Sequence, residues 1–134
     1  FARLTKNQRM PGKKAKNESL ILSEAVIASI QDKKGKGIVS LNLTGVKGSI
    51  CNYFVICHGT SRTHVEAIAD AVEDQVRVKL KEKPWHREGF ENAEWILLDF
   101  VDVVVHIFQE QTRSFYQLEK LWADAEIIKY ESED

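Results

Sequence analysis

Residues 95–108 read WILLDFVDVVVHIF, and this stretch decides the fold of the chain. Two apolar segments, 95–100 and 103–108, flank a short break at Val101-Asp102. Aromatic and β-branched side chains dominate both segments, which is typical of strands, so we expect a β-hairpin with a tight turn at the break. Large apolar groups alternate onto both faces of the first strand, so the sheet is either covered twice or presents one face to a partner.

The rest of the chain supplies helices and strands around this hairpin. Apolar residues three and four positions apart predict helices, and alternating or continuous apolar runs predict strands. The predicted helices are 20–34, 63–83 and 112–122, and the two further strands are 38–43 and 53–57. Residues 85–93 are polar and are expected to form a loop. The resulting order, α-β-β-α-β-β-α, predicts a single α/β domain.

The last predicted helix has two different faces. Its apolar face is expected to comprise Phe115, Leu118, Leu121 and Trp122. A second face carries Arg113, Tyr116 and Lys120. Tyrosine, tryptophan and arginine dominate binding hot spots, so this second face and Trp95 together are a candidate contact surface. The alternative is that Trp95 belongs to the core and Arg113 is a solvated charge.

Length and composition restrict the class of protein. The chain has 134 residues, which suits one domain, and its 43% apolar and 29% charged residues exclude a fibrous or disordered protein. No apolar run reaches about 18 residues, so the sequence predicts no membrane-spanning helix. Two cysteines, Cys51 and Cys57, are too few for a disulfide framework and indicate a reducing compartment.

Charge is distributed unevenly along the chain. Residues 1–17 carry six basic and no acidic side chains, whereas the remaining residues carry 13 basic and 20 acidic ones. We therefore expect a disordered basic arm over 1–17, a folded domain over 18–124 and an acidic C-terminal tail over 125–134. A short basic arm ahead of an acidic body fits a protein that works near nucleic acid without binding it tightly.

Two motifs resemble ligand sites but have simpler explanations. Cys51, Cys57, His58 and His64 are metal-ligand types, yet adjacent strand residues point to opposite faces and no Cys-x-x-Cys or His-x-x-x-His spacing exists, so no metal is expected. Gly59-Thr60-Ser61 precedes a predicted helix and could hold an anion there. A single glycine is a weak signal, so we favour a turn in which Ser61 or Thr63 caps the helix.

Two carboxylates leave an enzymatic alternative open. Asp99 and Asp102 bracket the predicted hairpin turn, where paired carboxylates could hold a divalent cation for nucleotidyl transfer. The simpler explanation is that Asp102 stabilises the turn. A Ser61–His106–Asp99 triad has no nucleophile elbow to support it. We therefore favour a noncatalytic protein and keep a metal-dependent nucleotidyltransferase as the alternative.

Several motifs match those of a known family. In the first half these are 53–56 (YFVI), 59–61 (GTS), 64–65 (HV) and 67–70 (AIAD). In the second half they are 88–89 (EG), 93–95 (AEW), 99–100 (DF), 102–108 (DVVVHIF) and 113–122 (RxFYxLExLW). With these motifs the chain resembles the ribosomal silencing factor family (Iojap/RsfS) over about residues 20–124.

The resemblance implies a mixed-sheet α/β fold related to nucleotidyltransferases but without catalysis, cofactor or small-molecule substrate. It also implies a translational repressor that binds the large ribosomal subunit through a ribosomal protein at the subunit-joining face. Small-subunit association would then be blocked sterically when nutrients are short. By motif, the partner-binding residues are Trp95, Asp102, His106, Arg113 and Tyr116. Such a protein acts in the bacterial cytoplasm or, alternatively, in an organelle matrix. A separate alternative for the Trp95 surface is that it forms the interface of a homodimer.

Three positions depart from the family pattern. Val101 stands where the family usually has glycine, and because valine resists positive φ, the turn is expected to be strained or of another type. Arg62 and Thr63 are exchanged relative to the usual order, and Trp85-His86-Arg87 makes the loop bulkier. The last helix, with its candidate contact residues, keeps the family pattern.

Overall fold

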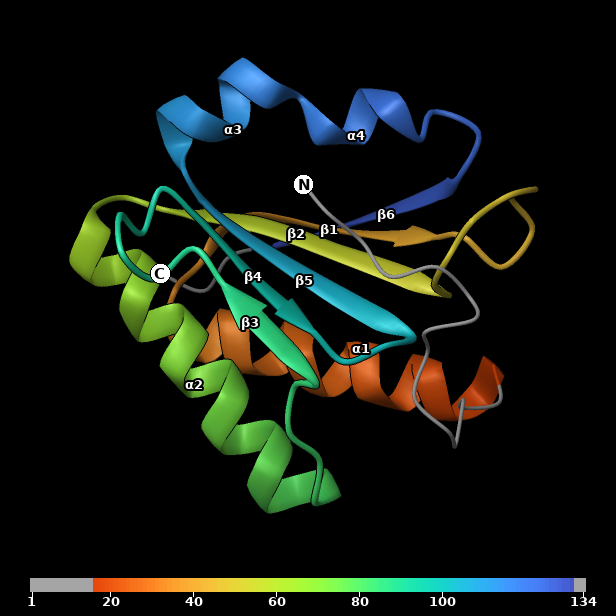
Figure 1. Ribbon diagram of the computed structural model, residues 1–134, viewed down its shortest axis with the longest axis horizontal. Coiled ribbons are helices and arrows are strands. Elements are labelled where there is room, and N and C mark those ends of the chain that lie inside the picture. The colour runs from red at the N-terminus through yellow and green to blue at the C-terminus, as the bar shows by residue number, and fades with distance from the viewer. Residues whose placement is uncertain (1–15, 132–134) are drawn as a thin grey trace.

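The computed structural model describes residues 16–131, so the expected basic arm lies almost entirely outside the described residues. Three layers make up the fold (Figure 1): a sheet lies between α1 and α2 on one face and α3 and α4 on the other. The helices are α1 (Lys16–Asp32), α2 (Arg62–Leu80), α3 (Glu110–Tyr116) and α4 (Leu118–Leu121). None of them combines the length and the apolarity that crossing a bilayer requires, a finding limited to residues 16–131.

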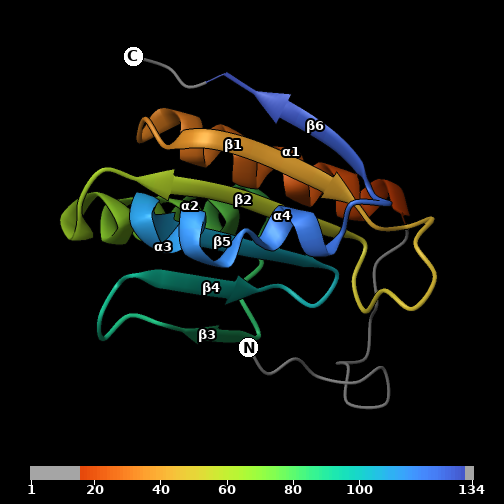
Figure 2. The same cartoon turned by 90° about the horizontal axis from the view of Figure 1, so that it is seen from above.

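Six strands form one mixed sheet, which confirms the predicted α/β class. They are β1 (Lys36–Asn42), β2 (Tyr53–Gly59), β3 (His86–Glu88), β4 (Trp95–Asp99), β5 (Val103–Gln109) and β6 (Glu126–Tyr130). Their order across the sheet is β3-β4-β5-β2-β1-β6, as Figure 2 shows. β2 and β5 pair in parallel and every other neighbouring pair is antiparallel. The predicted hairpin is β4–β5.

The sheet has an apolar core on each face, so it is covered twice, which is one of the two possibilities that the pattern of residues 95–100 left open. Beneath α1 and α2 the core includes Leu22, Ile30, Ile68, Val72 and Val105. Beneath α3 and α4 it includes Leu41, Phe54, Ile56, Phe108 and Leu118. The central strands β2 and β5 contribute to both cores, which explains their nearly continuous apolar sequences.

The turn between β4 and β5 is strained, which is one of the two outcomes expected for valine at position 101. Val101 has φ of 77°, and the backbone N–H of Asp102 donates to the carbonyl of Phe100 at 3.0 Å, which defines a γ-turn. The carboxylate of Asp99 accepts the Val101 N–H at 2.7 Å and supports this conformation.

Two strands were not predicted, so the predicted element order lacks both edges of the sheet. β3 lies in the expected loop 85–93, and β6 lies in the expected acidic tail 125–134. β3 has three exposed residues, and four of the five residues of β6 are exposed, so neither has a one-sided apolar pattern. Each is a strand because a neighbour offers free backbone groups: β4 for β3 and β1 for β6.

The last predicted helix is two short helices, and its predicted apolar face is confirmed at Leu118 and Trp122 but wrong at Phe115 and Leu121. Gln117 adopts a left-handed conformation with φ of 49° and separates α3 from α4. This break changes the direction of the side chains that follow. Leu118 is buried, whereas Phe115 is 80% exposed and Leu121 is 73% exposed.

Candidate functional site

Three aromatic side chains form a surface on the α3–α4 side of the sheet, which we call the aromatic surface (Trp95, Phe115 and Tyr116). The ring centroids of Trp95 and Tyr116 lie 5.0 Å apart, as do those of Tyr116 and Phe115. Tyr116 is 51% exposed, and Trp95 is half-buried beneath it. The structure thus places Trp95 and Tyr116, both predicted site residues, side by side on accessible surface.

The indole of Trp95 is fixed from below by strand β5. Its ring lies 4.8 Å from the ring of Phe108, the residue opposite it in the β4–β5 register. Its Nε1–H donates to Nδ1 of His106 at 3.1 Å, which requires a neutral imidazole with its proton on Nε2. His106 is completely buried and packs edge-on against Phe54. His106 therefore supports the aromatic surface and offers no surface of its own to a partner.

Arg113 projects into the molecule, although the sequence placed it on a contact face. Its guanidinium donates to the carbonyl of Gly37 at 2.7 Å, to Nδ1 of His58 at 2.9 Å and to the carboxylate of Glu119 at 2.8 Å. The Arg113 side chain is only 12% exposed. Its donors are therefore directed to partners inside the chain.

His58 is the neutral acceptor in this group. Because a guanidinium has only donors, Nδ1 of His58 must carry a lone pair. Burial lowers the pKa of His58 first, and the Arg113 charge lowers it further, against the opposing effect of Glu110 and Glu119. In the sequence His58 stands out only as a metal-ligand type, and no pattern indicates its contact with Arg113, 55 positions away.

Asp102 lies away from the aromatic surface. It precedes β5, whereas Phe108 lies near the other end of that strand, so six residues of extended chain, roughly 20 Å, separate the two. Its side chain is buried, and its carbonyl accepts N–H groups of Asn52 and Tyr53 at 2.8 Å and 3.1 Å. This placement fits a structural role at the start of β5.

The groups considered for catalysis have structural contacts. Ser61 accepts the N–H of His64 at 3.1 Å and is the N-cap of α2, as predicted. His64 accepts the Thr60 N–H at Nδ1, and its Nε2 lies 2.7 Å from the Lys33 carbonyl. Asp99 supports the β4–β5 turn. Between residues 16 and 131, no three His, Cys, Asp or Glu side chains gather in a way that could hold a metal ion.

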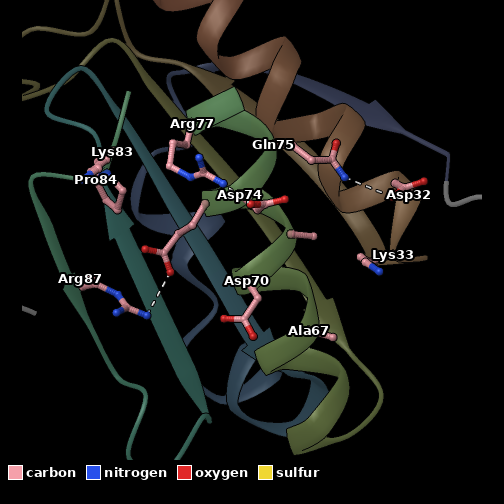
Figure 3. Close-up of a pocket in the computed structure, with 12 residues that line it drawn as sticks. Asp32, Lys33, Ala67, Asp70, Asp74, Gln75, Arg77, Lys83, Pro84 and Arg87 are labelled. Carbon is pink, nitrogen blue, oxygen red and sulfur yellow. Dashed lines mark hydrogen bonds and ion pairs between the residues drawn. The ribbon is translucent and has the colours of Figure 1, made fainter. Parts of the chain in front are cut away.

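A groove beside α2 carries charges of both signs. It is lined by Asp32, Lys33, Asp70, Glu73, Asp74, Arg77, Lys83 and Arg87, among others. Two contacts join residues that line it: Arg87 to Glu73 at 3.0 Å, and Gln75 to Asp32 at 3.1 Å (Figure 3). Burial raises the pKa of Glu73, and the Arg87 charge opposes this shift. Since acids and bases pair within the groove, it has no net preference for an anion or a cation.

A second groove adjoins the aromatic surface. It runs between the β3–β4 connection and α3, and Trp95 and Tyr116 line it. The carboxylates of Glu88, Glu91 and Glu94 also line it, together with Arg87, which stacks on Phe90 at 4.0 Å. Residues 85–93 were expected to form a polar loop, and the glutamates in and beside this segment were the available signal for an acidic border.

The sequence matches the family described as "Ribosomal silencing factor during starvation" over residues 15–134. Ribosomal silencing factor RsfS of Bacillus subtilis is 42% identical over 112 residues, covering 81% of this chain and 90% of the relative. The protein of the same name from Halalkalibacterium halodurans is 39% identical, covering 82% and 92%. A crystal structure of a Chromobacterium violaceum protein superposes with a TM-score of 0.73 at 31% identity, covering 78% of this chain and 85% of the other. The chain belongs to the ribosomal silencing factor family.

Proposed function

We propose that this protein is a noncatalytic translational repressor. It binds the large ribosomal subunit through a ribosomal protein at the subunit-joining face and sterically prevents the small subunit from docking. The observation that carries the proposal is the aromatic surface, in which exposed Tyr116 packs on half-buried Trp95 and exposed Phe115 packs on Tyr116. Membership of the ribosomal silencing factor family supports a ribosomal target.

The aromatic surface has the properties of a protein-binding hot spot. Tryptophan and tyrosine bury a large area and lose little rotamer entropy on binding. Here Trp95 is held by Phe108 and by the hydrogen bond to His106, so the surface is rigid before a partner arrives. Trp95 and Tyr116 are the proposed contact residues, whereas His106, Arg113 and Asp102 act by shaping the fold that presents them.

Charge favours a protein as the direct partner. Residues 18–134 carry 20 acidic and 13 basic side chains, and the groove beside the aromatic surface includes Glu88, Glu91 and Glu94. RNA phosphates are repelled by such a border, whereas a basic protein segment is attracted. We assign weak contacts with rRNA to the basic residues of the arm, whose effect should decline as salt rises.

Cosedimentation tests the binding step. Purified large and small subunits are each centrifuged with the protein, and the protein is expected to pellet with the large subunit alone. Equal recovery with small subunits would contradict the proposal.

Measuring the mass of the free protein in solution tests the alternative that the chain forms a homodimer. A dimer that Tyr116→Ala converts to a monomer would assign the aromatic surface to self-association. We place the activity in the bacterial cytoplasm, since the relatives named above are bacterial.

A further inference from the structure

Arg113 connects its own helix to three other elements of the fold, two of which are distant in sequence. The residue belongs to α3, and its guanidinium reaches β1 at the Gly37 carbonyl, β2 at His58 and α4 at Glu119. We call these four residues the Arg113 clamp. Tyr116 lies three positions after Arg113 on the same short helix. The clamp therefore fixes the helix that carries two residues of the aromatic surface.

The backbone of β1 is shaped around the clamp. Gly37 has φ of +58°, which favours glycine, and a Cβ at this position would lie 2.6 Å from Nη1 of Arg113 and 2.9 Å from Cε1 of His58. The β1–β2 register also shifts between Lys36 and Val39. Glycine at 37 thus lets the guanidinium and the imidazole approach the strand.

Apolar packing alone holds α3 and α4 weakly. None of the seven side chains of α3 is fully buried, and α4 buries only Leu118. Short helices have little stability of their own and depend on tertiary contacts. Two contacts of Arg113, with Gly37 and His58, attach α3 to the sheet, and its contact with Glu119 joins α3 to α4.

We propose that His58 and Arg113 are positioning residues that hold α3 and α4 on the sheet and release them when His58 gains a proton. The inference rests on the proposed function insofar as it takes the aromatic surface to be the docking surface. Protonation removes the lone pair that accepts from Arg113 and places a second cation beside the guanidinium. His58 thereby becomes a pH-sensitive support of the surface.

The charges around His58 determine the direction of the effect. From the helices, Arg113 of α3 and His64 of α2 disfavour the charged imidazole, whereas Glu110 of α3 and Glu119 of α4 favour it. From β1, Lys36 stands in register opposite His58. Burial and Arg113 are the two largest influences on His58, and both favour the neutral form. The clamp is accordingly closed at neutral pH and opens as the solution becomes acidic.

Three variants separate this role from a merely structural one. His58→Asn keeps an acceptor near the position of Nδ1 but cannot gain a proton. His58→Leu removes the acceptor at every pH. His86→Asn is the matched control. His86 is an exposed histidine of β3 that lies beside Glu88, which is not a clamp residue.

Hydrogen exchange of the full-length protein, corrected for intrinsic rates, provides the readout. Between about pH 7 and pH 5, the range in which histidine titrates, the amides of 110–121 should exchange faster relative to β2 and β5. We expect a change of about tenfold, which corresponds to one lost hydrogen bond to a charged group. In His58→Leu the amides of 110–121 should exchange rapidly at both pH values. In His58→Asn the same amides should exchange slowly at both pH values.

The outcomes distinguish the clamp from the proposed function. Wild-type exchange in His58→Leu, or a wild-type pH response in His58→Asn, would overturn the clamp and leave the proposed function intact. Loss of the pH response of the 110–121 amides in His86→Asn would also overturn the clamp. If the exchange behaves as expected but large-subunit binding at neutral pH is absent in the wild type, the proposed function fails and the clamp stands.

Discussion

Val101 adopts a backbone conformation that a β-branched residue disfavours. Its φ of 77° lies in the left-handed region, which is favourable for glycine and unfavourable for valine. The strands on both sides of it pair in the β4–β5 hairpin. Strain of this kind costs on the order of 1–3 kcal/mol. The turn is maintained because the paired strands and the Asp99 carboxylate hold it.

Replacing Val101 by glycine should therefore stabilise the protein. The relief of strain exceeds the roughly 1 kcal/mol that glycine costs through the entropy of the unfolded chain, so we expect a net gain of about 1 kcal/mol in denaturant melts. Val103→Gly is the matched control; it lies in the strand, where glycine should destabilise. A loss of stability in Val101→Gly would show that the turn is not strained.

Cys57 should be chemically inert in the folded protein. It is completely buried, and burial raises the pKa of its thiol to about 12, with Arg113 opposing. Only the thiolate attacks an alkylating agent, so native protein should resist iodoacetamide at mildly alkaline pH while denatured protein reacts at both cysteines. Mass spectrometry of the labelled chain measures this. Rapid native labelling at Cys57 would mean that the sheet opens far more easily than its packing implies.

At the scale of elements, the α3–α4 layer separates contact residues from supporting ones. Tyr116 and Phe115 are exposed, so Tyr116→Ala and Phe115→Ala should each cost less than about 1 kcal/mol of folding stability. Tyr116→Ala should nonetheless cost about 2 kcal/mol of partner binding, the scale of a hot spot. Leu118→Ala, at a buried position, should cost about 2 kcal/mol or more of stability. Denaturant melts and large-subunit binding curves on the three variants provide the comparison; loss of folding in Tyr116→Ala would contradict it.

The same layer shows what sequence patterns can and cannot predict. The β4–β5 hairpin and α2 were predictable because each buries apolar residues at a regular spacing. β3 and β6 were not, since they form through backbone pairing at the sheet edges and their side chains remain exposed. The left-handed Gln117 also left no periodic signal, so Phe115 was expected in the core although it is exposed.

Of the candidate site, only Trp95 and Tyr116 were predictable from the sequence, since Phe115 was expected in the core. Trp95 and Tyr116 could be proposed as contact residues because their types and the family motifs indicated binding. The inward direction of Arg113 depends on His58 and Gly37, whose contacts arise only when β1, β2 and α3 come together. Pairings between residues so distant in sequence follow from tertiary packing and not from local spacing.

At the scale of the whole molecule, stability should fall as the solution becomes acidic. The pKa of His58 is lower in the folded protein than its ordinary value of 6.5, so the unfolded chain binds more protons as pH falls through that value. Stability contributed by neutral His58 is thus present above pH 6.5 and declines below it. Thermal melts across this range should show a decline that His58→Asn reduces. An unchanged slope in this variant would assign the decline to other groups.

The central claim about the whole molecule is that the protein keeps the two ribosomal subunits apart. The most direct measurement is a sucrose gradient of purified large and small subunits, mixed under joining conditions with increasing amounts of the protein. We predict that whole ribosomes are lost in proportion to the protein bound to large subunits, and that Tyr116→Ala requires roughly thirtyfold more protein for the same effect. Undiminished joining when large subunits are saturated with the wild-type protein would contradict the central claim.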